Sequence, residues 1–104
     1  MSTTLEELGR SLEELAALLD RYRESSWAAT VRRVASQAGA AWSASGPPEA
    51  ARVVLGLFDG GMGGFGDVVL EDDGRVVTEA QRHLDAMRRG VFEQARDALS
   101  SRDI

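Results

Sequence analysis

Leucines recur at alternating steps of three and four residues near the start of the chain, and this spacing constrains the fold more than any other feature. The row consists of Leu5, Leu8, Leu12, Leu15 and Leu19, followed by Tyr22. Residues at these intervals share one face of an α-helix, so the pattern predicts an amphipathic helix over residues 4–23, capped by Thr3 or Thr4. The apolar face either packs into the core of its own domain or forms the seam of a coiled-coil homodimer.

Two more helices are predicted from apolar spacing and from helix-start signals. The second covers residues 26–43, with Ser25 or Ser26 as its cap. The third is short, over residues 48–58, because the Pro-Pro pair at 47–48 is tolerated in a first helical turn.

The character of the chain then changes. Residues 59–66 read DGGMGGFG and hold five of the 11 glycines. Short β-prone runs follow at 68–70 and 75–77, on either side of a turn-forming EDDG segment. This arrangement predicts a small β-hairpin with Gly74 in a left-handed conformation.

Thr78 opens the last predicted helix, over residues 78–100, and Thr78 with Gln81 matches a capping box. The fold class is therefore mainly α. We expect a single domain over residues 1–104, with four helices and with a glycine-rich loop and a short β-hairpin before the last helix. The ends, about 1–3 and 100–104, are expected to fray.

Composition excludes several kinds of chemistry. All 12 basic residues are Arg and there is no Cys, which removes disulfides, thiolate nucleophiles, Cys-type zinc sites and Lys-based phosphate or Schiff-base chemistry. The net charge of −5, with Arg interleaved among acidic residues, argues against nucleic acid as a partner. No apolar run is long enough to span a membrane and the start does not resemble a signal peptide, so we expect a cytoplasmic protein.

The glycine-rich segment matches a nucleotide-binding pattern by letter only. Gly61, Gly63 and Gly66 read G-x-G-x-x-G, but a helix is predicted before them and a strand after them, the reverse of a dinucleotide site. The kinase-like extension lacks its lysine. The segment is either a structural turn that returns Met62 and Phe65 to the core, or a recognition loop. The recognition residues would be Gly60, Gly61, Met62, Gly63, Phe65 and Asp67.

No catalytic, cofactor-binding or metal-binding residues are predicted. The acidic residues at 67 and 71–73 lack the spacing of a calcium loop, which indicates a solvated turn. His83 is the only histidine and has no cysteine to support a metal site. Trp27 and Trp42 lie about four helical turns apart on one face, where they serve either as core residues or as interface anchors.

Three runs, SSWAATVRR, LFDGGMGGFGDVVL and HLDAMRRGVFEQARDAL, resemble a small bacterial family of uncharacterised proteins that share a domain of unknown function. Members carry a Trp at the start of the second helix, a GGMGS-like segment leading into N-D-L-V-L, and N-E-R-L-D-x-L-R at the opening of the last helix. The matching positions are Trp27, Gly60, Gly61, Met62, Gly63, Asp67, Val69, Leu70, Leu84, Asp85 and Arg88. Gly64, Gly66 and Gln81 depart from the pattern. The resemblance, over about residues 15–99, implies the helical fold and a role for the loop but no activity.

These observations favour a non-enzymatic, small, acidic protein that binds a protein partner, as an immunity protein or antitoxin does. The alternative is a small-molecule or anion binder that uses the backbone N–H groups of loop 59–66. A third hypothesis is a homodimer through the leucine row Leu5, Leu8, Leu12, Leu15 and Leu19. Neither nucleic acid nor a membrane is expected as a partner.

Overall fold

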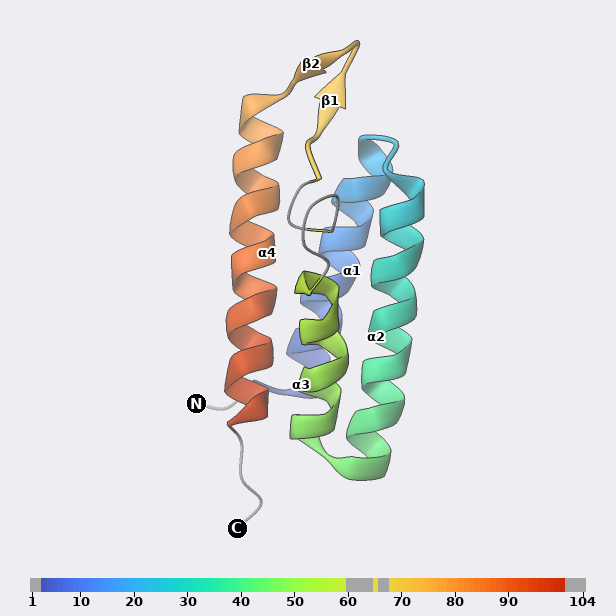
Figure 1. Ribbon diagram of the computed structural model, residues 1–104, viewed down its shortest axis with the longest axis vertical. Coiled ribbons are helices and arrows are strands. Elements are labelled where there is room, and N and C mark those ends of the chain that lie inside the picture. The colour runs from blue at the N-terminus through green and yellow to red at the C-terminus, as the bar shows by residue number, and fades with distance from the viewer. Residues whose placement is uncertain (1–2, 60–64, 66–67, 101–104) are drawn as a thin grey trace.

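The computed structural model describes residues 3–59, 65 and 68–100 and is shown in Figure 1. The first helix, α1, spans Leu5–Arg21. The Thr4 hydroxyl accepts a hydrogen bond from the Glu7 backbone N–H at 3.1 Å, and the Glu7 carboxylate accepts one from the Thr4 backbone N–H at 3.4 Å. This capping box satisfies two backbone donors at the helix start and confirms the predicted cap at Thr4.

The leucine row of α1 lies in the core of the chain itself. Leu8, Leu12, Leu15 and Leu19 are fully buried, whereas Leu5 is half-buried at the helix start. A dimer through this row would have to open that core, which is apolar throughout the described residues. The homodimer itself stays a prediction.

The second helix, α2, spans Ser25–Ser45 and begins one residue earlier than predicted. Arg23 adopts a left-handed conformation with φ 65°, and the Glu24 N–H bonds to the Leu19 carbonyl. The chain has therefore already turned at Glu24, which is the N-cap and makes no side-chain capping bond. The predicted cap at Ser25 or Ser26 is wrong because both serines lie within the first helical turn.

The third helix, α3, spans Pro47–Leu55 and starts at the proline pair, as predicted. Gly46 allows the sharp entry, because its φ of 93° is strained for other residues. The helix tightens into a 3₁₀ turn, η1, over Gly56–Phe58, so only the first part of the predicted range 48–58 is α-helical. The last helix, α4, spans Thr78–Leu99.

The four helices form an up-down-up-down bundle in which successive helices run in opposite directions (Figure 1). α1 and α3 each contact both α2 and α4. α4 has 22 residues and α3 has 9, so their lengths are about 33 Å and about 14 Å at 1.5 Å per residue. The remaining length of α4 is therefore covered by residues after η1, of which the structure describes Phe65 and 68–76. We call α3, η1, Phe65 and residues 68–76 the third leg.

The β-hairpin at the end of the third leg is smaller than predicted. Strand β1 is Glu71–Asp72 and strand β2 is Arg75–Val76, paired in antiparallel register. Asp73 and Gly74 have φ of 52° and 78°, the positive values that a two-residue type I′ turn requires, so the prediction for Gly74 is confirmed. Residues 68–70 lie outside the two strands, although the Leu70 carbonyl accepts a hydrogen bond from the Val77 N–H at 3.0 Å. The Leu70 N–H and the Val68 carbonyl bond to side chains of α4.

The capping box predicted for α4 does not form. The N-cap is Val77, with no side-chain capping bond, because the Gln81 side chain turns toward residues 68–70 of the third leg. Within the described residues, no helix is both long enough and apolar enough to cross a membrane.

Gly90 and Gly74 provide a matched test of this backbone geometry. Gly90 lies inside α4, where an added Cβ would meet no atom within 4 Å. We expect Gly90→Ala to stabilise the fold by about 0.5–1 kcal/mol, because alanine restricts the unfolded chain and favours the helix. Gly74→Ala should destabilise it by about 1 kcal/mol, because its φ is positive. Urea unfolding measures both, and a loss of stability in Gly90→Ala would contradict the packing described.

Asp97 ties the start of the chain to α4 and gives stability a pH dependence. Its carboxylate accepts a hydrogen bond from the Thr3 backbone N–H at 2.5 Å, and this bond lowers the pKa of Asp97 below the ordinary 3.8. The bond therefore stabilises the fold fully above the ordinary pKa, and its contribution is lost as the pH falls through the lower folded pKa. We expect Asp97→Asn to lower the thermal midpoint slightly at pH 7, by a difference that shrinks below about pH 4. A difference that is independent of pH would refute this role.

Candidate functional site

A line of aromatic rings crosses the bundle at the level where α3 has ended. Trp27 of α2 packs on Phe65 with ring centroids 5.3 Å apart, Phe65 on Phe58 at 5.7 Å, and Phe58 on Phe92 of α4 at 5.5 Å. These separations are those of favourable tilted and edge-to-face pairs. Phe65 is fully buried at the centre of the line. The rings replace the helical packing that a longer α3 would have supplied.

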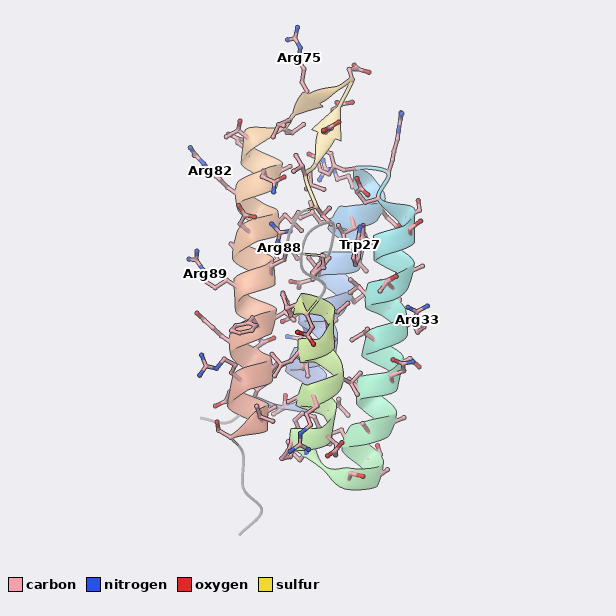
Figure 2. The ribbon with its side chains drawn as sticks, viewed as in Figure 1. Trp27, Arg33, Arg75, Arg82, Arg88 and Arg89 are labelled. Atoms are coloured by element: carbon pink, nitrogen blue, oxygen red, sulfur yellow. The ribbon has the colours of Figure 1, made fainter. Side chains whose placement is uncertain are left out.

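Arg88 of α4, labelled in Figure 2, contacts both the backbone and the ring of Phe65. One guanidinium nitrogen donates to the Phe65 carbonyl at 2.8 Å and to the Val68 carbonyl at 3.4 Å. The guanidinium carbon lies 5.8 Å from the centre of the Phe65 ring, within cation–π range. The other terminal nitrogen pairs with Asp85, one helical turn before it. Only 12% of the Arg88 side chain is exposed, so these bonds are largely shielded from water.

Gln81 completes the attachment one turn before Asp85. Its side-chain oxygen accepts from the Leu70 N–H at 2.8 Å, and its side-chain nitrogen donates to the Val68 carbonyl at 3.3 Å. The same nitrogen lies 3.5 Å from the Asp85 carboxylate. We call Gln81, Asp85 and Arg88 the clasp. Residues 68–70 lie in neither a helix nor a strand, so the Val68 carbonyl and the Leu70 N–H have no partner in a regular ladder, and the clasp supplies their partners.

The residues predicted as a recognition loop fall mostly outside the described part of the chain. Gly60, Gly61, Met62, Gly63 and Asp67 lie there. Phe65 is described and is a core residue. The proposed interface anchors Trp27 and Trp42 are both half-buried and pack against the core with part of their surface accessible.

Sequence reasoning missed the roles of Phe58, Phe92 and the clasp. A signal for the clasp is present in the sequence. In the last-helix segment that resembles N-E-R-L-D-x-L-R, the amide, the acid and the final arginine stand at Gln81, Asp85 and Arg88. Steps of four and three place all three on one side of a helix, which marks a polar row facing a neighbour.

Beyond the clasp, α4 exposes apolar surface. Phe92 and Leu99 are 37% and 38% exposed, and they lie seven residues apart on the side of α4 that bears the clasp. The Arg96 guanidinium lies 5.9 Å from the centre of the Phe92 ring. We call Phe58, Phe92 and Leu99 the aromatic face.

Two hollows of the described surface lie away from the aromatic face. One of about 290 Å³ separates the α1–α2 turn from the hairpin and is lined by Arg21, Tyr22, Arg23, Glu71, Asp72 and Asp73. A smaller one, about 160 Å³, lies between α1 and α4. His83 is exposed on α4, and no three His, Asp or Glu side chains of the described residues are grouped for a metal ion.

Comparison with known proteins identifies a family. The family model of a domain of unknown function, DUF6966, matches residues 20–78. This range runs from the end of α1 to the first residue of α4, and includes Trp27, Phe58 and Phe65. No curated protein and no solved structure matches the chain.

Arg88 and Arg89 are adjacent arginines in different environments, and substitution should separate them. Arg88→Ala removes the 2.8 Å bond to the Phe65 carbonyl and one of the two side-chain donors to the Val68 carbonyl, so we expect a loss of about 2 kcal/mol in unfolding free energy. Arg89 is exposed, and Arg89→Ala should change stability by less than about 0.5 kcal/mol. Urea unfolding gives both values, and near-UV circular dichroism of Trp27 reports the packing on Phe65. Equal losses in the two variants would show that the clasp does not hold the third leg.

Proposed function

The chain belongs to the DUF6966 family, a domain of unknown function, and from this premise we propose that it is a non-enzymatic, small, acidic, cytoplasmic protein that binds a protein partner. The binding surface is the aromatic face, with Trp27 at the other end of the aromatic line. The single observation that carries the proposal is the accessible Phe92 ring, which contacts both the Phe58 ring and the Arg96 guanidinium. Aromatic residues and arginine supply most of the binding energy at protein interfaces.

The clasp suits this surface to recognition. It fixes Phe65, and through it the rings of Phe58 and Trp27, to the rigid helix α4. A preorganised surface loses less conformational entropy when a partner binds, so more of the contact energy appears as affinity. Immunity proteins and antitoxins act in this way: a small stable domain covers a surface of another protein.

The test compares two exposed apolar residues. Phe92 lies on the aromatic face, whereas Val76, 53% exposed, lies on the hairpin. Tagged protein is crosslinked in its native host, and the captured partner is identified and purified. We expect Phe92→Ser to weaken binding of that partner by at least about tenfold, because a hot-spot ring contributes 2 kcal/mol or more. Val76→Ser should leave binding unchanged, and circular dichroism checks that both variants fold.

Two outcomes would contradict the proposal. One is the absence of any specifically retained protein, and the other is equal binding by wild type and Phe92→Ser. A thermal-shift screen with inorganic phosphate and nucleotides tests the anion-binding alternative in parallel. A ligand at 100 times its Kd would stabilise the fold by about 2.7 kcal/mol.

A further inference from the structure

The outward surface of α4 carries a row of arginines beside the aromatic face. Arg82, Arg89 and Arg96 follow one another at intervals of seven residues, so they lie close to one line along the helix. All three are exposed, and Figure 2 shows Arg82 and Arg89 projecting away from the bundle. We call these three residues the arginine row.

The arginine row is not neutralised within the described structure. The ion pairs of the described residues use Arg10, Arg32, Arg52 and Arg88 and none of the row. Asp85, the nearest acid toward the third leg, is already paired with Arg88. Glu79 and Glu93 also lie on the exposed part of α4, so the surface is basic without being a continuous cationic strip. This basic row stands out on a chain whose net charge is −5.

The distance between neighbouring arginines of the row indicates which kind of anionic partner fits it. Seven residues of helix correspond to about 10.5 Å, so neighbouring guanidinium groups are too far apart to share one phosphate or carboxylate. Carboxylates at seven-residue intervals on a partner helix repeat at the same distance. Phe92 and Leu99 are also seven residues apart, so they form a second line along α4, parallel to the arginine row. The two lines touch where the Arg96 guanidinium lies over the Phe92 ring.

We propose that α4 docks an acidic amphipathic helix of the partner protein. The partner helix lies along α4, with carboxylates spaced by seven residues opposite Arg82, Arg89 and Arg96 and apolar side chains covering Phe92 and Leu99. This inference rests on the proposed partner-binding function, and it specifies the charge and the secondary structure of the partner's contact surface. A nucleic acid fits less well, because it would leave Phe92 and Leu99 uncovered and would bring phosphates against Glu79 and Glu93.

The test uses defined probes. A synthetic helical peptide carries Glu at every seventh position and Leu in the adjacent row, and a second peptide has the same composition in scrambled order. A DNA duplex is the third probe. We expect the patterned peptide to bind wild type at least about tenfold more tightly than either of the others, and its affinity to fall with salt.

Charge reversal then locates the contact. Arg89→Glu should weaken binding of the patterned peptide by about tenfold, and a peptide with Lys in place of the facing Glu should restore it. Arg33→Glu, the matched control, changes the same charge at an exposed arginine of α2 (Figure 2) and should leave binding unchanged.

Three results would overturn the inference: equal binding of patterned and scrambled peptides, tighter binding of DNA, or equal effects of Arg89→Glu and Arg33→Glu. Its failure is distinguishable from that of the proposed function. A native partner that is lost in Phe92→Ser but is retained by Arg89→Glu supports partner binding and refutes the acidic helix.

Discussion

The guanidinium of Arg88, donating to the carbonyls of Phe65 and Val68, is the interaction on which the architecture depends. A four-helix bundle requires each position to be filled by groups whose backbone hydrogen bonds are satisfied. α3 ends after nine residues, and residues 68–70, which follow η1, lie in neither a helix nor a strand. Arg88 and Gln81 supply the missing partners from α4, so that Phe65, Val68 and Leu70 can be buried where helical side chains would otherwise lie.

The sequence predicts the helices well because their signals are local. The leucine row and Thr4 specify α1, and the prolines specify the start of α3. The errors occur where a long-range contact overrides a local preference. Residues 68–70 have β propensity and Gln81 matches a capping box, yet the Gln81 side chain binds the Val68 carbonyl and the Leu70 N–H, and the hairpin pairing continues only as far as the Leu70 carbonyl among the described residues. The β propensity of residues 68–70 does not depend on Gln81, and the capping pattern at Gln81 does not depend on residues 68–70. Rules based on periodicity and capping therefore cannot detect the contact between them.

The candidate site was harder to predict than the fold. The local sequence allows Phe65 to be either a core residue or a recognition residue. Its burial among Trp27, Phe58 and Arg88 assigns it to the core. The accessible Phe92 ring depends on where α3 stops relative to α4, which helical periodicity alone does not specify. α4 thus has two roles: one side holds the third leg, and the adjoining surface presents Phe92 with Arg96.

Native-state hydrogen exchange at the Leu70 amide tests the central claim most directly. This N–H is buried, belongs to no helix or strand ladder, and has the Gln81 side-chain oxygen as its acceptor at 2.8 Å. If α4 holds the third leg, Leu70 exchanges slowly in the wild type. In Gln81→Leu it exchanges much faster, while the amides of α1 and α2 keep their protection. A Leu70 amide that exchanges at the rate of an unstructured peptide in the wild type would contradict the account.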